Sequence, residues 1–461
     1  MAASTRQHAA PPTAPAAAGE VRAALAQARE RTLALVAPIG DADLHATHSA
    51  LMSPLVWDLG HIAAYEDLWL GHRYADLPLL HPDLADLYDA FETPREVRGH
   101  IEMLTRAPAL AYLRQTRKRT LEAIERHGVG DGVLHEMVIQ HEHQHNETML
   151  QTLGLARLPG AGPLGRGPEP AAPDARTQPG GLETVEVPAG PFALGAPDTR
   201  FSYDNERPRH PAQLPGFRIG RTPVTNATWL SFAEGGGYER REWWTDEGWA
   251  WKEEYDIERP AGWATGPPPT QRPLVEASAP RWHGEPVYEW RRGQWEPLQP
   301  DRPVVHVSWF EADAFARAHG VRLPTEAEWE KAATWDQASG ATHDWPWGEQ
   351  SPQARHANLF ETGVDGTALV GAFPDGAAPC GALGMIGDVW EWTATEFTGY
   401  PGFQAYPYPE YSKVFFGRGY RSLRGGSWAS SRRVATPTFR NWDLPIRRQI
   451  FAGLRIAQDA A

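Results

Sequence analysis

The first third of the chain carries apolar side chains at the spacing of α-helices. They recur every three or four positions in four segments, at about 20–36, 54–68, 105–127 and 131–153. Ser53 is expected to cap the second helix, with Pro54 in its first turn. The pattern predicts a four-helix bundle over residues 20–156, and its long connection, residues 73–104, is of a length typical of functional segments.

The pattern changes after residue 156. Residues 157–182 are rich in Pro and Gly and predict a linker, and short alternating strands with many Gly and Trp follow over 183–461. Two helices are marked by capping boxes, in which Ser308 pairs with Glu311 and Thr325 with Glu328. The expected fold class is therefore a multidomain α+β protein, a helical bundle followed by an irregular α+β domain.

Composition narrows the classes of function. The chain has 461 residues with a net charge of −14, which argues against nucleic acid or an anionic membrane as a partner. No run approaches 18 apolar residues, so no membrane span is expected. The Ala- and Pro-rich residues 1–19 are interpreted as a disordered tail rather than a signal peptide. The single Cys380 excludes an intrachain disulfide and fits a reducing, cytoplasmic location.

The last helix of the bundle carries the strongest chemical signal. His141 and His145 are four residues apart and share a helix face with apolar side chains such as Met137 and Met149. Two inward imidazoles at this spacing form half of a metal site. The alternative is a solvated polar helix that happens to be rich in His.

His61 is the best candidate for the third metal ligand. It lies on the same stripe of its helix as Trp57 and Tyr65, which predicts that it faces the bundle interior. The alternative for His61 is a core histidine that binds no ion. The stretch 141–145 also matches His-Glu-x-x-His, so a zinc hydrolase with Glu142 as general base is a further alternative. No downstream third-ligand pattern supports that alternative.

With these residues in hand, the chain resembles the iron-dependent sulfoxide synthases of ergothioneine biosynthesis and the related selenoneine synthases. The resemblance covers nearly all of residues 40–457. Its motifs are Ser53-Pro-Leu-Val-Trp-Asp-Leu-Gly-His61, Gln140-His-Glu-His-Gln-His-Asn-Glu-Thr-Met-Leu150, Arg322-Leu-Pro-Thr-Glu-Ala-Glu-Trp-Glu-Lys331, Gly387-Asp-Val-Trp-Glu-Trp-Thr393, Leu423-Arg-Gly-Gly-Ser-Trp428, residues 439–451 and Gly453-Leu-Arg455. It implies an N-terminal DinB-like four-helix bundle and a C-terminal domain like the formylglycine-generating enzymes, with a C-type-lectin-like core.

The resemblance implies Fe(II) bound by His61, His141 and His145. Three neutral imidazoles leave coordination positions open for a thiolate or selenolate and for dioxygen, which suits Fe(II) better than a closed structural zinc site. The formylglycine-generating enzymes themselves are a rival for the second half. Their chemistry uses a cysteine pair, which Cys380 alone does not supply.

The acceptor substrate implied by the resemblance is hercynine, the Nα-trimethylated betaine of histidine. Trp442 matches the residue whose ring faces the quaternary ammonium, Asn441 matches a carboxylate contact, and Gln144 matches a contact to the imidazole. The alternative for Trp442 is core packing.

The second substrate implied by the resemblance is γ-glutamylcysteine, cysteine or a selenosugar. Arg95 and Arg98, together with Asp443 and Arg447, match the positions that contact the donor in many family members. The alternative for each Arg is a surface charge, and with a selenosugar donor these residues would have less to do.

A tyrosine delivers a proton during C–S bond formation in the better-known members. Tyr400 is the expected residue, and Tyr408 the next. If Phe397 or Phe403 stands at that position instead, the proton source differs and a selenium donor is favoured. A non-catalytic ligand-binding protein is the alternative to enzymatic function, and the sequence leaves open the chalcogen donor, the oligomeric state and the role of the tail.

Overall fold

The computed structural model describes residues 17–158, 170–171, 181–266 and 279–460. Two compact units make up the chain. The first, called the bundle unit here, is Met1–Met149 with Ala196–Ser202, and the second, called the C-terminal unit, is Leu150–Gly195 with Tyr203–Ala461. Most of the predicted tail and linker, residues 1–16, 159–169 and 172–180, lies outside the described residues.

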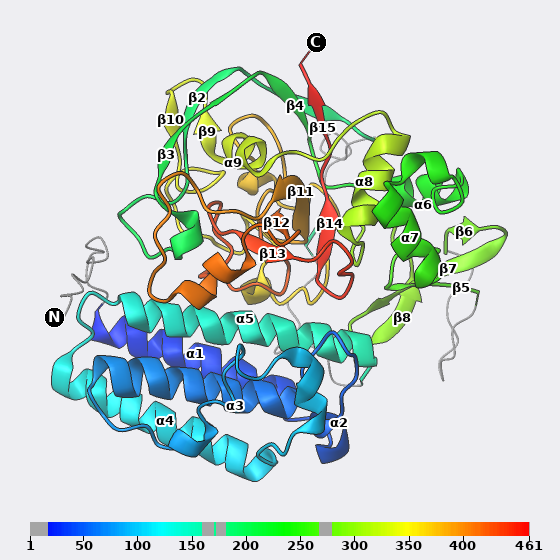
Figure 1. Ribbon diagram of the computed structural model, residues 1–461. Coiled ribbons are helices and arrows are strands. Elements are labelled where there is room, and N and C mark those ends of the chain that lie inside the picture. The colour runs from blue at the N-terminus through cyan, green and yellow to red at the C-terminus, as the bar shows by residue number, and fades with distance from the viewer. Residues whose placement is uncertain (1–16, 159–169, 172–180, 267–278, 461) are drawn as a thin grey trace. The chain divides into compact units, whose positions relative to one another are not determined.

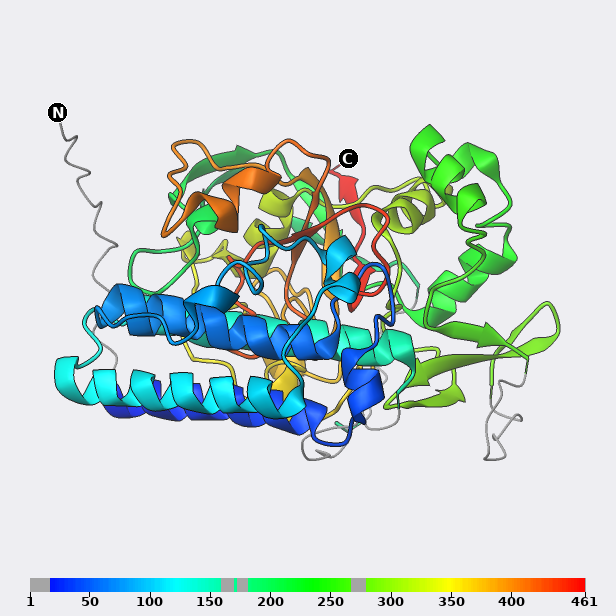
Figure 2. The same ribbon diagram turned by 60° about the horizontal axis from the view of Figure 1, so that its bottom comes forward.

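Four long helices form the bundle unit, and Figure 1 shows them running alongside one another. They are α1 (Ala18–Val36), α3 (Leu55–Glu66), α4 (Arg106–His127) and α5 (Val133–Ala156), with the short α2 (Asp41–His45) after α1. In Figure 2, α3 and α5 lie in one layer and α1 and α4 in the other. A π-helical segment, η1 (Asp67–Tyr74), continues α3 into the connection, which also contains η2 (Pro82–Leu84) and η3 (Arg95–His100).

The predicted cap of α3 is wrong by one residue. Pro54, not Ser53, occupies the N-cap, and no side chain caps the helix there. Ser53 Oγ instead accepts a hydrogen bond of 2.7 Å from Arg98, a residue of the long connection. The hydroxyl that was expected to satisfy the helix end therefore anchors the connection to the bundle.

A buried cluster of four charges joins the four long helices, with one residue from each. Arg29 on α1 and Arg117 on α4 each donate to both Glu66 on α3 and Glu142 on α5. These four hydrogen bonds are 2.7 to 2.9 Å long. We call these residues the charge clamp. Burial alone would raise the pKa of Glu66, but Arg117 and Arg29 outweigh it and lower the pKa to about 2.

The C-terminal unit is built from small sheets and short helices. Its central sheet has the order β13–β12–β11–β14, in which β11 and β14 are parallel and the other pairs antiparallel. These strands are β11 (Trp390–Glu396), β12 (Arg421–Arg424), β13 (Asn441–Asp443) and β14 (Ala452–Leu454). A second sheet pairs β1 (Thr184–Val187), β4 (Phe217–Gly220) and β15 (Ala457–Asp459).

The remaining strands and helices complete this unit (Figure 1). The strands are β2 (Gly190–Leu194), β3 (His210–Leu214), β5 (Trp263–Thr265), β6 (Arg281–Trp282), β7 (Glu285–Arg291), β8 (Gln294–Pro297), β9 (Trp335–Asp336) and β10 (Ala341–Thr342). The helices are α6 (Asn226–Glu234), α7 (Asp246–Glu254), α8 (Trp309–Ala318) and α9 (Glu326–Thr334). Both predicted capping boxes are confirmed, at the starts of α8 and α9.

A buried group of three side chains around Glu391 links the central sheet to α9. Glu391 on β11 accepts from the Arg455 guanidinium at 2.8 Å and from Trp329 Nε1 at 2.7 Å. All three side chains are almost completely buried. The motif residues of this unit therefore serve partly as a structural frame.

In the part of the chain that the structure describes, no helix has both the length and the apolar character of a membrane span.

We expect Glu142→Gln to destabilise the bundle strongly. The substitution leaves two buried guanidinium groups without one of their two anionic partners, which costs about 3–5 kcal/mol in the free energy of unfolding. Chemical denaturation measures the loss. The matched control is Glu125→Gln, because Glu125 forms an exposed pair with Arg22 and its loss should change stability little. Equal small effects of the two substitutions would contradict a stabilising clamp.

Candidate metal centre

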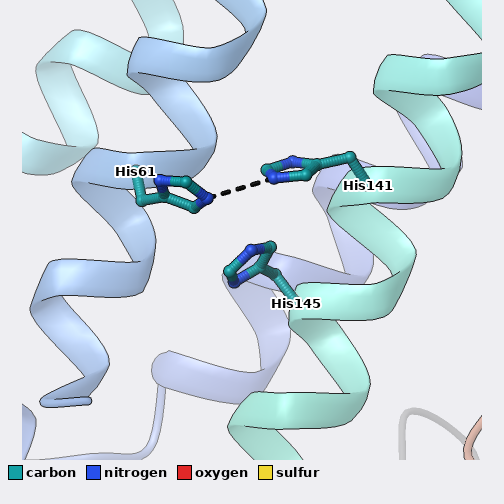
Figure 3. Close-up of side chains that lie close together, drawn as sticks. All are labelled: His61, His141 and His145. Carbon is teal, nitrogen blue, oxygen red and sulfur yellow. Dashed lines mark hydrogen bonds between the residues drawn. The ribbon is translucent and has the colours of Figure 1, made fainter. Parts of the chain in front are cut away.

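Three imidazoles converge inside the bundle unit. His61 comes from α3, and His141 and His145 come from successive turns of α5. One ring nitrogen from each lies within 4.8 Å of the other two. Figure 3 shows the rings pointing toward one another, and the Nε2 atoms of His61 and His141 are 3.1 Å apart.

Each ring is held by a different neighbour. His61 Nδ1 lies 2.6 Å from the carbonyl oxygen of Tyr88, and His145 Nδ1 lies 3.0 Å from Asp58 Oδ1. Because both partners only accept, Nδ1 carries a hydrogen in each imidazole, and the neutral form of each ring then has its lone pair on Nε2. His141 stacks face to face on Tyr65, with ring centroids 3.6 Å apart and an interplanar angle of 7°.

Burial keeps His61 and His141 uncharged. It lowers the pKa values of His61 and His141 well below the ordinary value, and the proximity of His145 lowers both further. At neutral pH these two imidazoles therefore retain the lone pairs that a metal ion needs. Two nitrogens bound to one ion at about 2.1 Å and at a right angle lie about 3 Å apart, so the separation of the His61 and His141 Nε2 atoms fits a shared transition-metal ion.

Several residues in the segment before His61 make specific contacts around its ring. Trp57 stacks on the His61 ring at 4.7 Å, and its Nε1 donates to the Leu87 carbonyl at 3.1 Å. A Cβ on Gly60 would lie 2.2 Å from the Tyr88 ring, so only glycine lets Tyr88 approach α3 this closely. Asp58 and Tyr88 were not predicted from the sequence. The spacing of Asp58, three residues before His61, was the available signal for Asp58.

Arg98 is buried in the connection. Its guanidinium lies 3.4 Å from the centroid of the Trp57 ring and donates to Ser53 Oγ and to the carbonyls of Thr93 and Ala90. Burial, with a contribution from the neighbouring charge of Arg95, lowers its pKa to about 9. These contacts close the connection onto α3. The alternative of a surface charge does not apply to Arg98, whereas Arg95 is exposed.

Glu142 belongs to the charge clamp and not to the imidazoles. It is 1% exposed, and its carboxylate accepts from Arg29, Arg117 and Thr32. A carboxylate engaged in this way is not available as a general base. The arrangement therefore argues against the zinc hydrolase suggested by His-Glu-x-x-His. Gln144, one residue before His145, is half-buried.

The predicted substrate residues of the C-terminal unit lie on and just after β13. Trp442 is half-buried, and its ring stacks on Phe397 at 4.3 Å and contacts the rings of Tyr411 and Phe415. Asn441 Oδ1 accepts from the Trp442 amide at 2.9 Å. Asp443 forms an ion pair with Arg447 at 3.2 Å, so the structure brings the predicted β13 residues and Arg447 together.

Tyr400 lies in a different environment from Trp442. Its ring packs with Phe192 and Leu194, and the Arg440 guanidinium lies 4.2 Å from the ring centroid. Burial raises the pKa of its hydroxyl. In the segment 396–408, Phe397 rather than Tyr400 stacks on Trp442. Tyr411, which the sequence analysis did not single out, also contacts Trp442. The proton-donor role of Tyr400 stays a prediction.

Comparison with known families agrees with the two-part architecture. Residues 24–149 match the DinB superfamily, and residues 169–460 match the family described as sulfatase-modifying factor enzyme 1-like domain. The fold and the site therefore define a protein that combines a DinB-like helical bundle with a sulfatase-modifying-factor-like domain. This confirms the predicted fold class.

Individual relatives identify the family to which the chain belongs. Hercynine oxygenase of Mycolicibacterium thermoresistibile is 46% identical over 95% of this chain and 95% of its own length. Hercynine oxygenase of Mycobacterium tuberculosis is 44% identical over 94% of this chain and 97% of its own length. The chain belongs to the hercynine oxygenase family. The formylglycine-generating enzyme of Thermomonospora curvata is 37% identical, over 46% of this chain and 70% of its own length.

We expect Gly60→Ala to disturb the centre through Tyr88. The new methyl group would displace the Tyr88 ring and with it the carbonyl that orients His61, which should cost about 1–3 kcal/mol of stability and weaken metal binding. Co(II) titration followed by absorbance measures the binding. The matched control is Gly154→Ala on α5, where nothing lies within 4 Å of the new Cβ. Unchanged metal affinity in Gly60→Ala would contradict the role given to Tyr88.

Proposed function

We propose that this protein is an Fe(II) enzyme that uses dioxygen to join sulfur or selenium to C2 of the hercynine imidazole. The observation that carries the proposal is the set of three convergent imidazoles of His61, which is buried, and of His141 and His145, which are half-buried. Within the described residues the group contains no carboxylate or thiolate, so several coordination positions remain for substrate and dioxygen. The names of the relatives supply the substrate, hercynine.

The proposed reaction with a thiol donor balances without a further reductant. The imidazole C2–H and the S–H bonds break, a C–S bond forms, and the sulfur becomes a sulfoxide. Forming the C–S bond releases two electrons and oxidising the sulfur releases two more, which together reduce one dioxygen. One oxygen atom enters the sulfoxide and the other leaves as water. Fe(II), when bound, supplies the redox chemistry with dioxygen.

The protein's own groups bind and orient the substrates. A quaternary ammonium has no hydrogen to donate and is attracted to aromatic faces, and Trp442 belongs to an aromatic group with Phe397, Tyr411 and Phe415. We assign the hercynine carboxylate to Asn441 and the imidazole contact to Gln144. Neutral His61 and His141 keep their lone pairs because they are buried.

The choice between a thiol donor and a selenosugar depends on which arginine side chains can bind the donor. Arg98 is buried and donates to two backbone carbonyls and a hydroxyl. Arg447 pairs with Asp443, and Arg95 is exposed. A donor with carboxylates, such as γ-glutamylcysteine, requires these cations, whereas a selenosugar does not. If Phe397, which stacks on Trp442, stands at the position of the proton-delivering tyrosine, the selenosugar is favoured, because a phenylalanine has no proton to deliver. With the sulfur donor, Tyr400 is the proposed proton source.

We expect turnover with a thiol donor or with a selenosugar when the purified protein receives Fe(II), hercynine and dioxygen. Mass spectrometry of a mixture containing both donors identifies the product and so decides between sulfur and selenium. His141→Ala should abolish product, while His127→Ala, which removes an exposed His at the end of α4, should not. Hercynine binding without product from any donor, in a protein that retains no metal, would favour a non-catalytic binding protein.

We expect Trp442→Leu to weaken hercynine binding by about 0.5–2 kcal/mol, the range for a cation over an aromatic face. Calorimetry measures the affinity for hercynine and for histidine, whose ammonium can be solvated by hydrogen bonds. Trp249→Leu is the matched control, because Trp249 is also half-buried and its ring already contacts Lys252. Equal losses for hercynine and histidine would argue that Trp442 serves only packing.

A further inference from the structure

One carboxylate lies directly behind the three imidazoles. Asp58 and His61 are one helical turn apart on α3, so both side chains face α5. Asp58 Oδ1 accepts the Nδ1–H of His145 at 3.0 Å, and the side chain is 1% exposed. The other oxygen, Oδ2, is also buried and has no hydrogen-bond partner among the described residues. The hydrogen bond to His145 therefore offsets part of the cost of burying this carboxylate.

The three imidazoles differ in what lies behind them. His61 donates to the neutral carbonyl of Tyr88, and the ring of His141 lies against Tyr65. Only His145 donates to a carboxylate. A carboxylate behind a ligating imidazole fixes its tautomer and increases the electron density on the nitrogen that faces the metal.

We propose that Asp58 is a positioning residue that makes His145 the strongest electron donor of the three ligands. In oxygen-activating iron sites with two His and one carboxylate, the carboxylate binds the metal directly. Here Asp58 would supply the negative charge through the His145 ring instead. The inference rests on the proposed metal centre. It goes beyond the ligand set, because it predicts that the ligands are unequal and that the affinity and potential of the ion depend on a residue that does not touch it.

The alternative is that Asp58 only ties α3 to α5. Both roles would lower stability on substitution, so stability does not separate them. The midpoint potential of the bound iron separates the two roles. Removing a negative charge from behind a ligand raises the potential, whereas loosening the contact between two helices has no fixed effect on its direction.

The experiment compares Asp58→Asn with Asp41→Asn. The first keeps the shape and an acceptor oxygen but removes the charge, and the second removes a carboxylate that is exposed on α2 and paired with Arg106. We expect Asp58→Asn to bind Co(II) about 10–100-fold more weakly and to shift the Fe(III)/Fe(II) midpoint potential upward. Asp41→Asn should change neither quantity. Wild-type affinity and potential in a folded Asp58→Asn protein would overturn the proposal, even if its stability falls.

A measurement on the metal-free wild-type protein keeps the test independent of any variant. Nitrogen NMR of labelled histidine should show His145 with its hydrogen on Nδ1, and the opposite tautomer would overturn the proposal. Asp58→Glu retains the charge and should keep the potential closer to that of wild type than Asp58→Asn does. If the wild-type protein binds neither Co(II) nor Fe(II), the proposed function fails, while the tautomer of His145 still reports on Asp58 separately.

Discussion

Four buried charges determine where the helices of the bundle can lie. Arg29, Glu66, Arg117 and Glu142 come one from each long helix, and each charge has partners on two other helices. Rotating or sliding any one helix would leave a buried charge unpaired, which costs far more than a surface ion pair is worth. Glu66 follows His61 by five residues on α3, and Glu142 lies between His141 and His145 on α5. The clamp therefore sets the register in which the three imidazoles meet.

The long connection completes what the clamp begins. Its backbone carbonyls at Tyr88 and Leu87 receive the hydrogens of His61 and Trp57, and its Arg98 covers the Trp57 ring. The connection can reach α3 this closely because residue 60 has no side chain. The connection thus orients His61, one ligand of the candidate centre. This contact gives a physical reason for the prediction that a connection of this length has a functional role. The site combines helices that supply the three imidazoles with an irregular segment that fixes the tautomer of His61.

Sequence patterns were informative where they depend on local periodicity. The spacing of His141 and His145, the interior stripe of His61 and the capping boxes of α8 and α9 follow from helical geometry within one segment. Roles that depend on a partner segment could not be predicted in this way. Glu142 matched a hydrolase motif because spacing does not reveal that two arginines from other helices surround its carboxylate. Asp58 was missed because its partner, His145, lies 87 positions away. Segment 396–408 has no periodicity, so the sequence could not show that Phe397 rather than Tyr400 lies against Trp442.

The C-terminal unit shows why a shared signature need not mean shared chemistry. Glu391, Arg455 and Trp329 all stand in motifs that carry the family resemblance of this unit, and all three belong to one buried hydrogen-bonded group. Cys380 is half-buried, its thiol donates to the Ala332 carbonyl at 3.2 Å, and burial raises its pKa, which disfavours the thiolate. The conspicuous motifs thus build the frame of this unit. The proposed function places specificity in side chains that the frame leaves partly exposed, and the proposed place for the trimethylated cation is the aromatic group around Trp442.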